Sequence, residues 1–127
     1  MNRTETVCIV DDDDAVRDSM RALLESYGHP VRDYPSAAAF LDDLPNPEPG
    51  CLLVDLHMPG MSGLELVEVL RCRHIQTPSI IVTALKETVL PARAKEAGVL
   101  VTLSKPVTNE ELIGWIDCAL EAGRAAN

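Results

Sequence analysis

Short runs of apolar residues recur along the chain, and polar residues or helical apolar spacing separate them. Three of these runs are Val7 to Val10, Leu52 to Val54 and Ile80 to Val82. Continuous apolar runs are typical of strands in a parallel sheet that helices cover on both faces. The pattern predicts five strands, at residues 6–10, 29–34, 51–55, 79–83 and 99–103.

Between and after these strands, apolar residues recur at helical spacing. Ser36 and Thr108 stand where N-caps are expected, and Thr108 with Glu111 predicts a capping box. Strands that alternate with helices indicate an α/β fold with a parallel sheet and right-handed crossovers. The predicted helices are residues 14–27, 37–44, 64–73 and 87–97, and a last one that begins near 108; the apolar stripe of the first comprises Val16, Met20, Leu23, Leu24 and Tyr27.

Composition and charge narrow the classes of function. The 127 residues suffice for one domain with a proper core, and because only 3% are aromatic, aliphatic side chains must fill it. The net charge of −9 would repel a nucleic acid, so direct nucleic-acid binding is not expected. No apolar stretch is long enough for a signal peptide or a membrane span, which predicts a cytoplasmic protein without membrane contact.

Reactive side chains stand at the ends of four predicted strands. Asp11 and Asp12 follow the first, Asp55 ends the third, Thr83 ends the fourth and Lys105 follows the fifth. If the strand order is 2-1-3-4-5, a ligand is expected where the chain direction reverses, between the first and third strands. Three carboxylates at this point require a cation, and Mg²⁺ suits oxygen ligands beside a phosphoryl group.

Four motifs together resemble the receiver domain of two-component response regulators. They are Ile-Val-Asp-Asp ending at Asp12, Val-Asp-Leu-His-Met-Pro-Gly-Met-Ser-Gly at 54–63, Val-Thr-Ala at 82–84, and Lys105-Pro106. Their spacing is most similar to receivers of the nitrogen-fixation regulator type. The resemblance implies a flavodoxin-like five-stranded parallel sheet of order 2-1-3-4-5 flanked by five helices. We expect one receiver domain over residues 1–127, standing alone without an effector domain.

The resemblance also implies a role for each motif residue. Asp55 would be the phosphoacceptor, in a reaction that depends on Mg²⁺ or alternatively Mn²⁺. The metal ligands would be Asp12, Asp55 and the main-chain carbonyl of His57, with Asp11 acting largely through water. Thr83, the amide of Ala84 and Lys105 would bind the phosphoryl oxygens, and the Lys105–Pro106 bond would be cis.

Two positions depart from the family pattern. Receivers usually carry a tyrosine or phenylalanine at the position of Thr102, and a phenylalanine at that of Val107. An aromatic rotamer switch is therefore absent at residue 102. We expect shifts of the backbone and of the helices to transmit the signal instead.

The expected partners follow from the resemblance. A sensor histidine kinase or a phosphotransfer protein would donate the phosphoryl group. The output would be a protein contact or a homodimer through the face formed by the fourth helix, the fifth strand and the fifth helix. Trp115 on that last helix is expected in the core rather than in an interface. The domain would not be an enzyme beyond catalysing its own phosphorylation and dephosphorylation.

Two alternatives stay open from the sequence. Asp11 and Asp13 have the D-x-D spacing of haloacid dehalogenase-type phosphatases, but the chain after Lys105 shows a loop and one helix rather than the further acidic pair. The second alternative is a phosphorylation-independent interaction module of the same fold, which Thr102 and Val107 favour. Asp13 and Asp14 are expected to start a helix, and His29 to be a plain surface residue.

Overall fold

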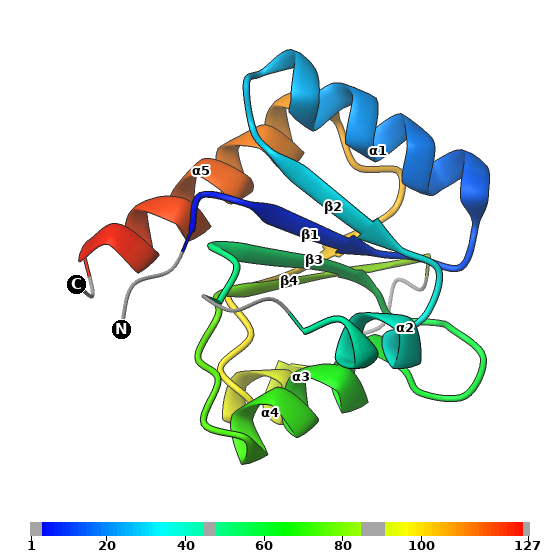
Figure 1. Ribbon diagram of the computed structural model, residues 1–127, viewed down its shortest axis with the longest axis vertical. Helices are drawn as coiled ribbons and strands as arrows, with labels where there is room; N and C mark the ends of the chain where they lie inside the picture. The colour runs from blue at the N-terminus through cyan, green and yellow to red at the C-terminus, as the bar shows by residue number, and fades with distance from the viewer. Residues whose placement is uncertain (1–3, 45–47, 85–90, 126–127) are drawn as a thin grey trace.

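The protein forms a five-stranded, all-parallel sheet with the strand order β2-β1-β3-β4-β5 (Figure 1). The computed structural model describes residues 4–44, 48–84 and 91–125. The order and direction of the strands confirm the predicted sheet. The strands are β1 (Val7–Val10), β2 (Val31–Tyr34), β3 (Cys51–Asp55), β4 (Ser79–Thr83) and β5 (Val101–Ser104).

Helices cover both faces of the sheet, as the apolar runs predicted. Helices α1 and α5 pack on one face, and α2, α3 and α4 pack on the other (Figure 1). Their bounds are α1 (Asp14–Ser26), α2 (Ala37–Asp42), α3 (Gly63–Cys72), α4 (Pro91–Glu96) and α5 (Asn109–Ala125).

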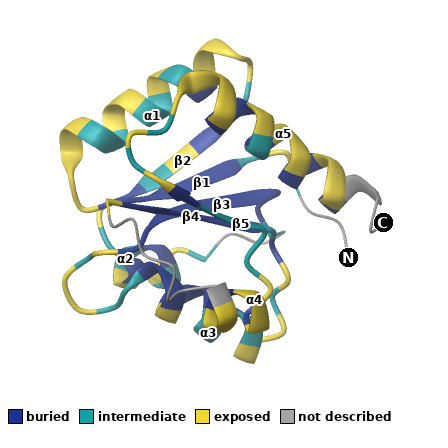
Figure 2. Ribbon diagram, turned by 180° about the vertical axis from the view of Figure 1, so that it is seen from behind, coloured by how far each residue is buried: buried dark blue, intermediate teal, exposed yellow. Residues whose placement is uncertain are grey.

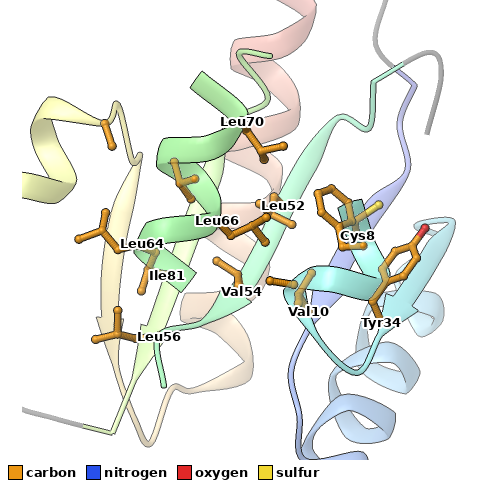
Figure 3. Close-up of a cluster of buried hydrophobic side chains, with 14 of the residues drawn as sticks. Cys8, Val10, Tyr34, Leu52, Val54, Leu56, Leu64, Leu66, Leu70 and Ile81 are labelled. Carbon is orange, nitrogen blue, oxygen red and sulfur yellow. The ribbon is translucent and has the colours of Figure 1, made fainter. Parts of the chain in front are cut away.

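The central strands are buried along their whole length, whereas the edge strands are partly exposed (Figure 2). Successive residues of a strand face opposite sides, so each strand contributes to two cores. Val10, Val54 and Ile81 pack beneath α2, α3 and α4 in the cluster of Figure 3. Ile9 and Ile80 belong to the second cluster, under α1 and α5. Both cores are mainly aliphatic, as the composition required.

The structure shortens several predicted elements at their ends. The second strand begins at Val31 because the amide of His29 still bonds the carbonyl of Leu24, at the end of α1. The fifth strand begins at Val101, since the amide of Val99 bonds Ala94 and so belongs to the final turn of α4. The start of the predicted fourth helix, at 87–90, lies outside the described residues.

Two assignments at the end of α1 were wrong. Tyr27 does not continue the apolar stripe: it is the C-cap of α1, its amide bonds the preceding turn, and 56% of its surface is exposed. His29 is not a plain surface residue, because its side chain is only 15% exposed and its Nε2 lies 3.4 Å from Oδ1 of Asp117 in α5. A residue just past a helix end is placed by the turn that follows, which helical periodicity does not describe.

The predicted N-caps are confirmed. Oγ of Ser36 accepts a hydrogen bond from the amide of Ala39, and Oγ1 of Thr108 accepts one from the amide of Glu111. Asp13 caps α1 by accepting from the amides of Ala15 and Val16, which gives it the helix-start role expected from the sequence.

Candidate functional site

The polar residues predicted to form a site lie at the carboxyl-terminal edge of four adjacent strands. Asp11 follows β1 and Asp55 ends β3, and these strands pair with Val10 opposite Val54. Thr83 ends β4 opposite Ser104 of β5, and the next residue, Lys105, donates its amide to the carbonyl of Thr83 at 2.7 Å. Strand order and register therefore bring together residues that are up to 94 positions apart in the sequence.

Asp11 is fixed in place by hydrogen bonds on nearly all of its polar atoms. Its amide donates to the carbonyl of Tyr34, and its carbonyl accepts from Nη1 of Arg17 at 2.7 Å. Its Oδ1 accepts from the amide of Asp13 at 2.9 Å. Its Oδ2 is buried and has no hydrogen-bond partner within the described residues.

A buried carboxylate oxygen without a hydrogen-bond partner indicates a site for a ligand, because burying such an oxygen unpaired costs free energy. Asp11, Asp12 and Asp55 each offer an oxygen, and these oxygens lie within 4.8 Å of one another. Burial raises the pKa of Asp11 above its ordinary value, and the carboxylates of Asp55 and Asp12 act in the same direction. Three hard oxygen donors of like charge fit a divalent cation.

Lys105 supplies positive charge next to Asp55. Its Nζ lies 3.0 Å from Oδ1 of Asp55, whose side chain is 9% exposed, while that of Lys105 is 34% exposed. The ammonium group therefore points into the site and remains reachable from solvent. The Lys105–Pro106 peptide bond has the cis geometry that the family resemblance implied.

Thr83 and Ala84 lie at the same edge. Thr83 is buried, and Ala84 directly after it is exposed. The backbone at the end of β4 thus runs from the core to the surface beside Asp55. Thr83 ends, and Ala84 follows, the strand that pairs with β3, whose last residue is Asp55.

The loop from β3 to α3 closes tightly over Asp55. Gly63 donates its amide to the carbonyl of Leu56, and a Cβ at Gly63 would lie 2.6 Å from the carbonyl oxygen of Asp55. Ser62 and Glu65 form a capping box at the start of α3. Sequence reasoning missed this capping box, although the S-x-x-E spacing signals one. The side chain of His57, in the same loop, is exposed.

The two atypical positions lie near this edge of the sheet. Thr102 is half-buried in β5, paired with Ile81 of β4. Val107 lines an open, mainly apolar groove of about 370 Å³ beside Lys105, between α1 and the start of α5. Trp115 is partly buried against the cluster under α5, in agreement with its predicted core position.

The strand order, with helices on both faces and an acidic cluster at the carboxyl ends of the strands, defines a flavodoxin-like α/β domain. The family model of the response regulator receiver domain matches residues 7–117, and the chain belongs to this family.

Relatives and solved structures agree with this assignment. The transcriptional regulatory protein FixJ of Azorhizobium caulinodans is 40% identical over 120 residues, which are 94% of this chain and 56% of that protein. The response regulator protein TodT of Pseudomonas putida is 35% identical, over 94% of this chain and 53% of that protein. The chain thus spans about half the length of these curated relatives.

Among solved structures, the crystal structure of FixJ-N superposes with a TM-score of 0.85 at 37% identity, and covers 94% of this chain and 95% of that one. The response regulator StyR gives a TM-score of 0.90 at 36% identity, over 95% of this chain and 61% of that chain. Within the described residues, no helix combines the length and the hydropathy needed to cross a bilayer.

Proposed function

We propose that the chain accepts a phosphoryl group on Asp55 from the phosphohistidine of a sensor histidine kinase or a phosphotransfer protein. Membership of the receiver family supports this class of reaction. The observation that carries the residue assignment is the setting of Asp55: its buried carboxylate lies 3.0 Å from Nζ of Lys105 and within 4.8 Å of an oxygen of each of two further carboxylates.

In this reaction a carboxylate oxygen of Asp55 attacks the phosphorus atom. The new P–O bond makes an acyl phosphate, the P–N bond to the imidazole breaks, and its electron pair stays on the leaving nitrogen. Lys105 balances the charge of the phosphoryl oxygens. The hydroxyl of Thr83 and the amide of Ala84 donate hydrogen bonds to them.

Asp11, Asp12, Asp55 and the main-chain carbonyl of His57 would hold Mg²⁺, or alternatively Mn²⁺. When bound, this ion offsets the charge that gathers between carboxylate and phosphoryl oxygens. The acidic cluster supports this role, because one of its oxygen donors is buried and has no hydrogen-bond partner among residues 4–44, 48–84 and 91–125. In this role the domain catalyses only its own phosphorylation and dephosphorylation.

The signal would leave through the face formed by α4, β5 and α5, toward a protein partner or a second copy of the chain. Phosphorylation adds charge beside Thr83 and Lys105, and both residues are adjacent to β5. Thr102 lacks the ring of the usual aromatic residue, so the shift passes through the backbone. Thr102 and Val107 are also the observations that favour the second candidate, a phosphorylation-independent interaction module.

Labelling with acetyl phosphate and Mg²⁺ separates these functions. The proposal requires a base-labile adduct on the wild-type protein and none on Asp55→Asn. Labelling of Asp55→Asn at the wild-type rate would show that another residue is the acceptor. A wild-type protein that never labels, with or without Mg²⁺ or Mn²⁺, would favour the interaction module.

A further inference from the structure

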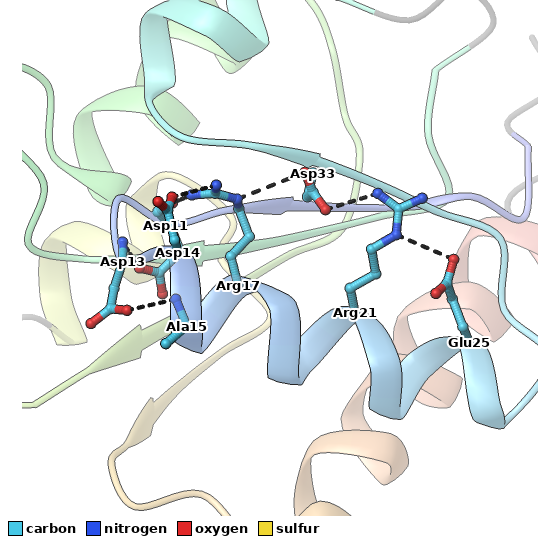
Figure 4. Close-up of polar contacts among 8 residues, drawn as sticks. All are labelled: Asp11, Asp13, Asp14, Ala15, Arg17, Arg21, Glu25 and Asp33. Carbon is cyan, nitrogen blue, oxygen red and sulfur yellow. Dashed lines mark hydrogen bonds and ion pairs between the residues drawn. The ribbon is translucent and has the colours of Figure 1, made fainter.

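Arg17 of α1 reaches back to the loop that carries the acidic pair. Its Nη1 donates to the carbonyl of Asp11 at 2.7 Å, and its Nη2 donates to Oδ1 of Asp14 at 2.6 Å (Figure 4). Its Nε lies 3.7 Å from Oδ1 of Asp33 in β2. The side chain is only 13% exposed, so this guanidinium has given up most of its water for these partners.

Asp33 lies within ion-pair distance of Nε of Arg17, which is buried and has no hydrogen-bond partner within the described residues. Its other oxygen, Oδ2, accepts from Nη1 of Arg21 at 2.8 Å, and Nε of Arg21 lies 3.2 Å from Glu25 (Figure 4). Both arginines therefore tie α1 to β2 through the same carboxylate. Arg17 also contacts the acidic loop, whereas the contacts of Arg21 lie further along α1, with Asp33 and Glu25.

We propose that Arg17 is a positioning residue for the cation site, an inference that rests on the proposed function. The carbonyl that Arg17 holds belongs to the peptide group that joins Asp11 to Asp12. Fixing this peptide restricts ψ of Asp11 and φ of Asp12. It therefore restricts the directions in which both carboxylate side chains leave the backbone. With its amide, its carbonyl and Oδ1 all engaged, Asp11 presents Oδ2, the one polar atom of this residue without a hydrogen-bond partner in the part of the chain that the structure describes.

The positioning role requires a side chain with several hydrogen-bond donors in a fixed arrangement, which the planar guanidinium group provides. Arginine presents several N–H donors in a fixed plane, so it can bond the Asp11 carbonyl and the Asp14 carboxylate at the same time. A lysine keeps the positive charge but has one nitrogen on a flexible stem. The exchange of Arg17 for lysine therefore removes the positioning and preserves the local charge.

The test measures Mn²⁺ binding directly, by the loss of the free-ion signal in electron paramagnetic resonance, without any phosphodonor. The variants are Arg17→Lys and the matched control Arg21→Lys, which changes the other arginine on Asp33. Residues that orient metal ligands typically contribute about 10-fold or more to affinity, so we expect Arg17→Lys to bind Mn²⁺ about 10-fold more weakly. Arg21→Lys should bind with wild-type affinity.

Thermal unfolding of the same samples separates positioning from stability. If Arg17 only supported the fold, the two lysine variants would lose stability without a change in Mn²⁺ affinity. Wild-type affinity in Arg17→Lys would overturn the inference, and so would an equal loss in Arg21→Lys. A wild-type protein that binds no Mn²⁺ would overturn the proposed cation site and the role of Arg17 together.

Asp33→Asn keeps the inference testable if Arg17→Lys does not fold. This substitution withdraws the carboxylate beside Nε of Arg17 and leaves every residue of the acidic cluster unchanged. We expect several-fold weaker Mn²⁺ binding, in the same direction as for Arg17→Lys. Unchanged Mn²⁺ binding in this variant would contradict the inference.

Discussion

Arg93 of α4 donates hydrogen bonds to both carboxylate oxygens of Glu68 in α3, from Nε to Oε2 at 2.9 Å and from Nη2 to Oε1 at 2.6 Å. A second arginine, Arg71 of α3, donates to the carbonyls of Ala97 and Gly98 at the other end of α4. The helix that begins the proposed output face is thus tied to α3 by two arginines. Any shift of α4 must move these contacts or carry α3 with it.

The Glu68–Arg93 pair makes a contribution to stability that depends on pH. The hydrogen bond from Arg93 lowers the pKa of Glu68 below its ordinary value of 4.5. A carboxylate whose pKa is lower in the folded state stabilises the protein above its unfolded-state pKa, and this contribution is lost as the pH falls through the folded-state value. We therefore expect Glu68→Gln to melt at a slightly lower temperature at neutral pH, with the difference shrinking as the pH falls below the ordinary glutamate value of 4.5.

Thermal unfolding between pH 7 and pH 3.5 checks this expectation. Glu96→Gln, at the exposed end of α4, is the control, because Glu96 takes part in none of the ion pairs within the described residues. A melting difference for Glu68→Gln that persists or grows in acid would show that the carboxylate acts by another route.

Removing the ammonium group of Lys105 should strengthen cation binding and slow phosphorylation. Its ammonium lies 3.0 Å from Asp55, so it competes with a divalent cation for the same carboxylate and also balances the incoming phosphoryl charge. Lys105→Met is therefore expected to bind Mn²⁺ more tightly and to label with acetyl phosphate on the order of 100-fold more slowly. Lys95→Met, on the exposed surface of α4, serves as the control and should change neither property. Parallel losses of both properties in Lys105→Met would point to a collapsed site instead.

Much of this site could be predicted because it lies at strand ends. The apolar runs located β1, β3 and β4 to within a residue, and parallel strands bring Asp11, Asp55 and Thr83 to one edge. The bond from Arg17 to the Asp11 carbonyl was not predicted, because an arginine near the start of a helix usually faces solvent. Glu68 and Arg93 are 25 residues apart, and no local pattern indicates that their helices pack side by side.

The four cysteines should separate into two reactive and two protected thiols. Cys72 and Cys118 are exposed, whereas Cys8 and Cys51 are buried in the sheet. Burial raises the pKa of Cys8 to about 12 and that of Cys51 further, so neither forms the reactive thiolate at neutral pH. A chromogenic disulfide reagent should titrate two thiols in the native protein and four after unfolding in guanidinium. Four fast-reacting thiols at pH 7.5 in the native protein would contradict the buried placement of β1 and β3.

Two glycine substitutions should change stability in opposite directions. A methyl group at Gly63 would lie 2.6 Å from the carbonyl oxygen of Asp55, so the β3–α3 loop or the end of β3 must move. We expect Gly63→Ala to lose about 1–3 kcal/mol of unfolding free energy and to label more slowly on Asp55, because the acceptor shifts with its backbone. A Cβ at Gly114, exposed within α5, meets nothing within 4 Å. Gly114→Ala should therefore gain about 0.5–1 kcal/mol and label normally.

Urea unfolding and acetyl phosphate labelling of both glycine variants measure the two effects separately. Loss of stability with normal labelling in Gly63→Ala would show that the loop yields while Asp55 stays in place. Loss of labelling in Gly114→Ala would mean that α5 is coupled to the acceptor more tightly than its packing indicates. The combination of a destabilised, slow Gly63→Ala and a stabilised, normal Gly114→Ala is expected, since only Gly63 contacts the residue that we propose to carry the phosphoryl group.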